Sequence, residues 1–326
     1  FRKGSTCMFS TKLRKTLAVV ASATLLCTSL TACNRDSGGN NAAGDSANKS
    51  ITFALSTQAN SFMVKMREGA QKKADELGLT INFQDASDDS ATQANQLANA
   101  AATGAGAVIV NPTDSDAMAP AVKQLTDAKI PVVAVDRAVN NAEVSSYIAS
   151  DNVGGGKQAA KALSEAIHGE GEILVLQGKT GSSASRERGQ GFDEGLKDSP
   201  NIKVVAKQTA EFERVKGLDV TTNLLQAHPN VKAIFAENDE MALGAIEALG
   251  DKAGKDVIVV GFDGVEDALK AIKEGTMYAS IAQQPADMAA QAVVEASKLL
   301  KGEAATKEMQ VDVVTVTKDN VDKFSG

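Results

Sequence analysis

Short apolar runs alternate with longer amphipathic stretches along this chain, and the alternation is completed twice. In the first round we predict helices at 61–78, 91–104 and 114–128, lying between strands at 51–56, 81–86, 107–112, 131–137 and 146–151. In the second round we predict helices at 155–167, 184–198, 214–227, 240–249 and 265–274, and strands at 172–178, 202–209, 231–239, 256–264 and 277–283. Strand–helix repetition at this spacing is typical of βαβ units and parallel sheets.

Two rounds of this pattern in 326 residues predict two similar lobes, because one small core cannot accommodate so long a chain. A further helix at about 286–301 and a strand at 311–316 follow the second round. That last segment is long enough to return to the first lobe and cross once more. The expected fold class is therefore α/β, with two parallel-sheet lobes.

The first 32 residues are typical of a signal peptide. The basic sequence KLRK (12–15) precedes an apolar stretch (16–30) that is too short for a comfortable transmembrane span. The stretch runs into LTAC (30–33), the pattern of a bacterial lipoprotein signal, so we expect cleavage before Cys33 and lipidation of its thiol. The alternative is an ordinary secretory signal with a chance Cys. Residues 33–50, rich in Asn, Gly, Ser and Ala, predict a flexible tether.

Charge and cysteine usage exclude several classes of function. Residues 1–32 carry five basic side chains and no acidic one, so removing them takes the net charge from -7 to -12. A protein this acidic, with no basic run, is a poor nucleic-acid binder. All three Cys lie at or before Cys33, and the chain has two His, so we expect no disulfide, metal site or cofactor in the mature domain.

Polar side chains recur where the predicted strands end. In a parallel sheet the carboxyl ends of the strands are where ligands bind. The residues at or just past these ends that we select as a candidate site are Ser56, Asn60, Asp136, Arg137, Asn238, Asp263 and Gln283. Each has a local alternative, since Asn and Asp cap helices and Asp136 can simply pair with Arg137. For Asp114 and Asp239 we keep the helix-cap interpretation.

These side chains suit a ligand with many hydroxyl groups. A carboxylate accepts hydrogen bonds from two neighbouring hydroxyls, a guanidinium donates to two, and an amide does both. Asp, Arg, Asn and Gln converging from two lobes therefore predict a site for a neutral sugar. A phosphate site would require a different pattern: the sequence DNVGGGKQ (151–158) lacks the upstream Gly and the Ser or Thr of a phosphate-binding loop. We interpret it as the start of a helix at a chain crossing.

Enzymatic functions fit the sequence less well. Asp136 and Asp263 are a conceivable glycosidase pair. We expect each to sit among hydrogen-bonding partners, with no apolar pocket to raise the pKa of one of them. His168 and His228 lie in loop-like sequence at helix ends, and no Ser-His-Asp set is evident. We therefore expect no catalytic activity.

Several segments resemble the periplasmic ribose-binding proteins, within the wider group of sugar-binding lipoproteins and repressors that share their fold. The segments are VNPTDSDAMAPAV (110–122), IASDNVGGGKQAA (148–160), SASRERGQGF (183–192), AHPNVKAIFAENDEMALGA (227–245) and VIVVGFDGVEDALKAI (257–272). The resemblance spans about residues 51–316. It implies the type I periplasmic binding protein fold, with two α/β lobes joined by three crossing strands. On that pattern the N-terminal lobe comprises 51–150 and 284–312, and the C-terminal lobe 151–283 and 313–326.

The resemblance also adds site residues and partners. It implies that Phe62 and Phe212 stack on a sugar ring and that Arg188 joins the polar set. It further implies a monomer that binds D-ribose between its lobes and delivers it to an ABC permease. Together with the lipoprotein signal, this places the protein outside the cytoplasm, anchored to a membrane by lipid.

Met63 departs from the family, which tends to have two consecutive Phe where this chain has Phe62-Met63. One interpretation is that Met63 fills a gap in the core. The other is that it replaces a stacking ring in the ligand site, so Met63 is included among the candidate site residues.

Two alternatives to an importer component remain. A repressor of the same fold requires an N-terminal helix-turn-helix and a basic face, whereas this chain has a lipoprotein signal and a net charge of -12 without residues 1–32. A component that presents a sugar or autoinducer to a membrane sensor in signalling or chemotaxis is also compatible with the sequence.

Overall fold

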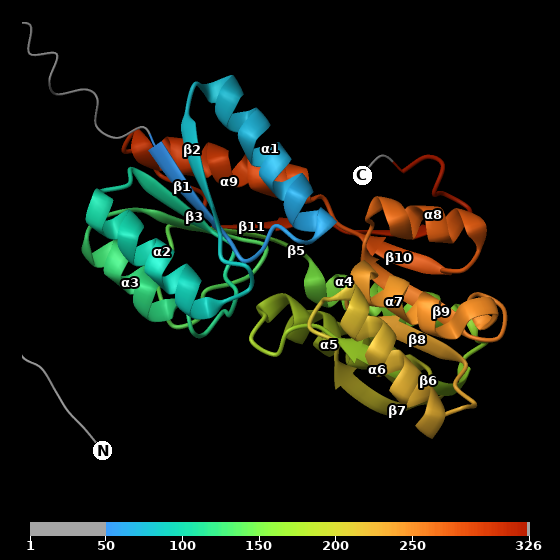
Figure 1. Cartoon of the computed structure of the whole chain (residues 1–326). Helices are drawn as coiled ribbons and strands as arrows, with labels where there is room; N and C mark the ends of the chain where they lie inside the picture. Colours follow the sequence, from blue (N-terminus) through green and yellow to red (C-terminus); the bar gives the residue numbers. More distant parts are fainter. Residues whose placement is uncertain (1–49, 325–326) are drawn as a thin grey trace, which may run out of the picture. The chain divides into compact units, whose positions relative to one another are not determined.

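The structure, a computed structural model, describes residues 50–324 and contains two six-stranded sheets flanked by helices (Figure 1). Residues 1–49, which include the expected signal peptide, Cys33 and nearly all of the tether, lie outside the described part. The predicted α/β class with two parallel-sheet lobes is confirmed.

The first sheet is wholly parallel, with strand order β11-β5-β4-β3-β1-β2. Its strands are β1 (Ser50–Leu55), β2 (Thr80–Asp85), β3 (Ala107–Val110), β4 (Val132–Val135), β5 (Ser146–Ser150) and β11 (Glu308–Val311). Its helices are α1 (Ser61–Leu77), α2 (Ser90–Thr103), α3 (Ala119–Asp127) and α9 (Pro285–Leu300). Side chains of β1 alternate between the faces: Ile51 and Phe53 pack against α1 and α9, and Ala54 packs against α2 and α3.

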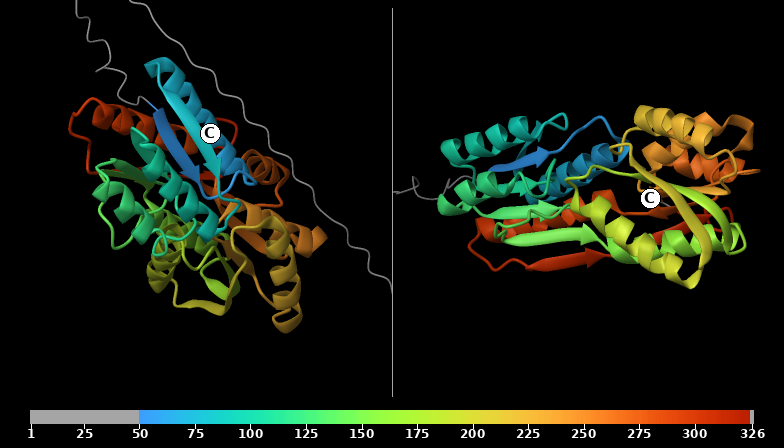
Figure 2. Two further views of the ribbon diagram at one scale, coloured as in Figure 1. Left: turned by 60° about the vertical axis from the view of Figure 1, so that its left-hand side comes forward. Right: turned by 90° about the horizontal axis from the view of Figure 1, so that it is seen from below.

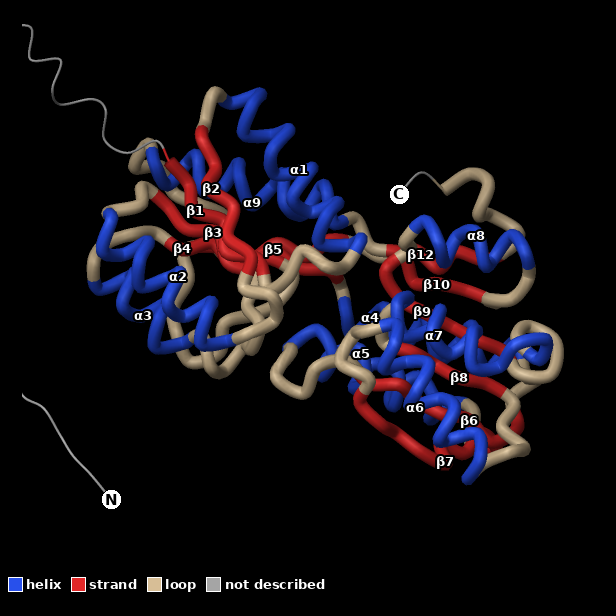
Figure 3. The backbone as a smooth tube through the Cα atoms, viewed as in Figure 1, coloured by secondary structure: helices blue, strands red, loops and turns tan. Residues whose placement is uncertain are grey.

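The second sheet has the strand order β12-β10-β9-β8-β6-β7, and β12 is its one antiparallel strand. Its strands are β6 (Glu170–Gln177), β7 (Asn201–Thr209), β8 (Ala233–Ala236), β9 (Ile258–Asp263), β10 (Ala279–Ala282) and β12 (Val314–Thr317). Its helices are α4 (Asn152–Ala166), α5 (Ser183–Gly195), α6 (Arg214–Ala227), α7 (Asp239–Leu249) and α8 (Glu266–Glu274). One hydrophobic cluster joins the sheet to α4 and α5, and another joins it to α6, α7 and α8, so both faces are covered (Figures 2 and 3).

The chain crosses between the sheets three times, from β5 to α4, from β10 to α9 and from β11 to β12. The strand predicted at 311–316 is wrong as a single element. It forms two short strands, because β11 pairs with β5 in the first sheet and β12 pairs with β10 in the second. The break falls at residues 312–313, where the chain passes from one lobe to the other.

Two helices begin three or more residues away from the predicted start. Helix α3 begins at Ala119 rather than 114, because the Oδ1 of Asp114 accepts from the backbone N–H of Asp116 and Ala117 and closes a turn first. Helix α4 begins at Asn152 and includes the glycines of the crossing sequence; Asp151 caps it by accepting from the N–H of Gly154. No helix within residues 50–324 combines the length and the apolar content that a membrane span requires.

Candidate functional site

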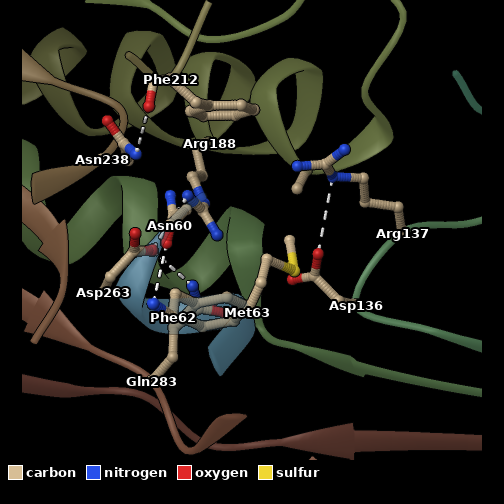
Figure 4. A pocket seen from close by; sticks show the side chains of 11 residues that line it. Asn60, Phe62, Met63, Asp136, Arg137, Arg188, Phe212, Asn238, Asp263 and Gln283 are labelled. Carbon is tan, nitrogen blue, oxygen red and sulfur yellow. Dashed lines mark hydrogen bonds and ion pairs between the residues drawn. The ribbon is translucent and has the colours of Figure 1, made fainter. Parts of the chain in front are cut away.

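A cavity lies where the carboxyl ends of strands from both sheets converge (Figure 4). It is lined by Asn60, Phe62, Met63, Asp136, Arg137, Ala184, Arg188, Phe212, Asn238, Asp263 and Gln283. Because the first five residues belong to the first lobe and the next five to the second, a ligand here would contact both.

The structure brings ten of the eleven sequence-predicted site residues to this one cavity and leaves Ser56 out of its lining. Ser56 is fully buried at the end of β1, where its N–H lies 3.3 Å from the Oδ1 of Asn111. Ala184 lines the cavity and was not predicted, since an Ala in a helix gives no sequence signal. Met63 fits both interpretations offered for it, because it lines the cavity and also packs in the core of the first lobe.

Two aromatic rings face the cavity from opposite sides, Phe62 from the first lobe and Phe212 from the second (Figure 4). Phe62 lies on the first turn of α1, where the side chain of Asn60 caps the helix by accepting from the Phe62 N–H at 2.8 Å. The ring of Phe212 lies 5.5 Å from the guanidinium carbon of Arg137 and 5.9 Å from that of Arg188. Flat apolar faces with charged groups around them match the C–H faces and hydroxyl edge of a sugar ring.

Asp136 and Arg137 form an ion pair, with 3.5 Å between Oδ2 and Nε, and both also line the cavity. The geometry is therefore compatible with both interpretations of the pair, a local ion pair and part of a ligand site. The Oδ2 of Asp136 accepts from the Nδ2 of Asn111 at 2.8 Å, and the Nη1 of Arg137 donates to the carbonyl of Pro112 at 3.1 Å. These contacts to the loop after β3 fix both charges with little exposure to water.

Arg188 is held by contacts on several sides within the second lobe. Its Nε donates to the Oδ1 of Asn152 at 3.0 Å, and its Nη1 donates to the carbonyl of Glu237 at 2.7 Å. Its guanidinium carbon lies 3.9 Å from the ring centre of Phe262, a cation–π contact. Helix α5 reaches this position because α4 packs closely against it: a Cβ at Gly156 would lie 2.3 Å from the carbonyl oxygen of Arg188.

Asp263 links Arg188 to one of the crossings between the lobes. Its Oδ1 accepts from the Nε2 of Gln283 at 2.7 Å and lies 3.4 Å from the Nη1 of Arg188. Gln283 follows β10 directly, on the crossing from β10 to α9. A ligand that contacts Asp263 would therefore contact a carboxylate that is hydrogen-bonded to a segment crossing between the lobes.

Three residues of the cavity have a positive φ angle, which is uncommon for residues other than glycine: Asp136 (67°), Phe212 (65°) and Asp263 (122°). Such conformations cost about 1–3 kcal/mol each and persist only where the surroundings enforce them. For Phe212 one such contact is given by Asn238, whose Nδ2 donates to the carbonyl of Phe212 at 3.2 Å while its Oδ1 caps α7. The surroundings therefore hold these three residues in conformations that they would not adopt alone.

The cavity keeps unused hydrogen-bonding capacity. Among the described residues, the Nε of Arg137 and the Oε1 of Gln283 are buried and have no hydrogen-bond partner. Buried polar atoms are normally paired, so the Gln283 oxygen is an acceptor available to a bound molecule, whereas the Arg137 nitrogen already lies 3.5 Å from the Oδ2 of Asp136. Within residues 50–324 no three His, Cys, Asp or Glu side chains gather as metal ligands.

Burial shifts the ionisation of carboxyl groups near the cavity. It raises the pKa of Asp263 to about 7, although the positive charge of Arg188 and the hydrogen bond from Gln283 act in the opposite direction. The expectation that nothing around Asp136 and Asp263 would raise the pKa of either is therefore wrong for Asp263. Burial also raises the pKa of Glu237 to about 7. Glu237 accepts from Ser185 and from the N–H of Gly178 at 2.7 Å, while its Oε1 has no partner among the described residues.

Some residues that support the site were missed by sequence reasoning. Asn111 holds Asp136, and Asn152 holds Arg188, but neither lines the cavity. Asn111 directly follows β3, so the strand-end argument applied to it as well. The helix-cap interpretation of Asp239 is wrong, because Asn238 caps α7 and Asp239 binds elsewhere.

The two lobes contact each other beside the cavity. The Ser115 N–H donates to the carbonyl of Gly181 at 2.8 Å, and the Ala138 N–H donates to the Oγ of Ser183 at 2.9 Å. Lys179 forms an ion pair with Asp88 at 2.8 Å. In each pair one partner lies in the first α/β lobe and the other in the second.

Comparisons with known proteins agree with this geometry. Residues 51–304 match a family described as "Periplasmic binding protein domain". The ribose import binding protein of Salmonella typhimurium is 44% identical over 272 residues, which cover 83% of this chain and 92% of that protein. The ribose import binding protein of Bacillus subtilis is 39% identical over 298 residues, which cover 90% and 96%. The crystal structure of a Caulobacter myo-inositol binding protein with myo-inositol has a TM-score of 0.82 at 32% identity, covering 85% of this chain and 96% of that one.

Glu237 gives a pH prediction that needs no ligand. Its carboxyl has a pKa raised from 4.5 to about 7 in the folded protein, so folding favours the protonated form. This contribution to stability is complete below about pH 4.5 and is lost as the pH rises through about 7. We expect Glu237→Gln to remove this contribution. The free energy of unfolding of the variant should therefore rise relative to that of the wild type as the pH increases from about 4.5 to about 7.

Urea unfolding at a series of pH values measures this difference. Glu247→Gln, an exposed substitution on α7, is the matched control and should follow the wild type throughout. Parallel profiles for Glu237→Gln and the wild type would contradict the predicted ionisation of Glu237.

Proposed function

The chain belongs to the periplasmic binding protein family, and from that premise we propose that it binds D-ribose between its two lobes and delivers it to an ABC importer. The observation that carries the proposal is the cavity itself, which offers two aromatic faces and a surrounding set of Asp, Arg, Asn and Gln side chains. Ribose is the ligand proposed because two ribose import binding proteins are 44% and 39% identical to this chain. Proteins of this family are solute receptors, and the proposed role is binding rather than catalysis.

Each group in the cavity has a role in this proposal. Phe62 and Phe212 would lie against the two faces of the sugar ring. Asp136 and Asp263 would accept from pairs of hydroxyls, and Arg137, Arg188, Asn238 and Gln283 would donate to hydroxyl oxygens. Because the groups come from both lobes, the complete set exists only when the lobes are closed. Sugar binding would therefore shift the population toward the closed form, which is the form that docks on the permease.

Calorimetric titration with D-ribose, D-galactose, D-glucose and D-xylose tests the ligand. We expect D-ribose to bind with a dissociation constant of about 1 μM or tighter, which is about -8 kcal/mol. Xylose differs from ribose in the orientation of one hydroxyl, so its weaker binding would report hydroxyl recognition. Tighter binding of another sugar would overturn ribose as the ligand, and no binding of any of them would overturn the proposed function.

Asp136→Ala tests the central carboxylate. The substitution removes an acceptor for the sugar and leaves Arg137 buried without its ion-pair partner, so we expect a loss of about 2–5 kcal/mol of binding free energy. Calorimetry with D-ribose measures it. Asp127→Ala, an exposed position on α3, is the control and should bind like the wild type. An Asp136→Ala affinity within about tenfold of the wild type, or about 1.4 kcal/mol, would remove Asp136 from the site.

We also propose that the mature protein acts as a monomer held at a membrane by lipid on Cys33, outside the cytoplasm. Support comes from the LTAC sequence (30–33) and from the family, whose members bind solutes outside the cytoplasm. Expressed as the full chain in a bacterium, the wild type should partition with membranes, whereas Cys33→Ala should be neither lipidated nor cut at the same position. Mass spectrometry of the mature N-terminus distinguishes them; identical soluble products would refute lipidation.

A further inference from the structure

Asp239 is a buried carboxylate beside the cavity that has no part in the proposed ligand contacts. It is the first residue of α7 and is fully buried, yet Asn238 already caps this helix through the N–H of Met241 at 2.9 Å. It does not line the cavity. A fully buried carboxylate is costly, so its partners indicate what it does.

The carboxylate of Asp239 binds the turn that follows β9. Its Oδ2 accepts from the backbone N–H of Gly264 at 2.7 Å and from that of Val265 at 3.0 Å. The hydroxyl of Ser280 lies 2.8 and 2.9 Å from the two carboxylate oxygens and also 3.0 Å from the Gly264 N–H. Two consecutive N–H groups on one carboxylate oxygen fix the direction of the peptide planes at residues 264 and 265.

The neighbouring strands leave room for this carboxylate. Gly261 on β9 pairs with Ser280 on β10, and a Cβ at Gly261 would lie 2.2 Å from the Oδ1 of Asp239. Only glycine fits at that point without moving the carboxylate. Three separate elements therefore form the surroundings of the Asp239 carboxylate: the start of α7 and the strands β9 and β10.

The turn that Asp239 holds carries the second carboxylate of the cavity. Asp263 directly precedes Gly264 and has a φ of 122°, the largest positive φ of any described residue other than glycine. Such a conformation needs enforcement from its surroundings. On the other side of the turn, Val265 packs against the hydrophobic clusters of both lobes. The same turn thus aims Asp263 at the ligand and contributes to contact between the lobes.

We propose that Asp239 is a positioning residue for ligand binding, which holds the turn at residues 263–265 so that the Asp263 carboxylate points into the cavity. The inference rests on the proposed function and deepens it. Asp239 acts as the acceptor for two N–H groups, a role that an amide oxygen in the same place could also fill.

Two substitutions test whether Asp239 acts as a hydrogen-bond acceptor. Both are measured by calorimetry with D-ribose on the full-length mature protein. Asp239→Ala leaves the Val265 N–H without its acceptor and the Gly264 N–H with the Ser280 hydroxyl alone, and we expect it to weaken ribose binding about tenfold or more. Asp239→Asn keeps an acceptor oxygen and should stay within about threefold of the wild type. Glu247→Ala, exposed on the same helix, is the matched control and should bind like the wild type.

A double-mutant cycle with Asp263→Asn distinguishes positioning from a general loss of structure. If Asp239 acts through Asp263, then Asp239→Ala should cost much less affinity in the Asp263→Asn background than in the wild type. Ser280→Ala, a milder change at the same carboxylate, enters the same cycle in case Asp239→Ala fails to fold, and it should show the same non-additivity.

Three outcomes would each overturn this inference and leave the proposed function standing. They are additive losses of affinity in the cycle, an Asp239→Ala protein that unfolds at a lower temperature but binds ribose normally, and an Asp239→Asn protein that binds as weakly as Asp239→Ala. A wild-type protein that binds no ribose would overturn the proposed function and this inference with it.

Discussion

Four ionisable side chains that line the cavity lie almost entirely out of water, and the rest of the site depends on how they are paired and hydrogen-bonded. Asp136 and Arg137 in the first lobe, and Arg188 and Asp263 in the second, each have 6% or less of their surface exposed. Burying a charge is costly unless it is paired and hydrogen-bonded. In each lobe a carboxylate and a guanidinium lie 3.4 or 3.5 Å apart and are supported by amides and carbonyls of their own lobe.

The support within each lobe explains how the site can exist before a ligand arrives. Asn111 fixes Asp136, and Asn152 fixes Arg188, so the charges do not have to be ordered when the lobes close. The lobes also meet beside the cavity, where the Ser115 N–H donates to the carbonyl of Gly181 and the Ala138 N–H donates to the Oγ of Ser183. Closure therefore needs little rearrangement within either lobe, and the differential contacts of a ligand with both lobes can shift the equilibrium.

The fold was accessible from the sequence because the inner strands β1, β3, β4, β8, β9 and β10 are short, apolar and buried on both faces, while the helices keep one apolar side. The sequence pointed to Asp136, Asp263 and Gln283 because these cavity-lining side chains lie where parallel strands end. It could not find Arg188, which lies within α5 and looks like a surface charge, or Phe212, which depends on a loop with positive φ. Those two came from the resemblance alone. Asp239 was misassigned because an Asp after a strand looks the same in sequence whether it caps a helix or braces a distant turn.

We propose that one small ligand is held by groups from both lobes, so that binding and closure are a single event. Small-angle X-ray scattering of the protein with and without saturating D-ribose measures closure. Ribose should lower the radius of gyration of the wild type and leave that of Asp136→Ala unchanged at the same concentration. An unchanged radius of gyration in the wild type, under conditions where calorimetry shows that ribose is bound, would contradict this proposal.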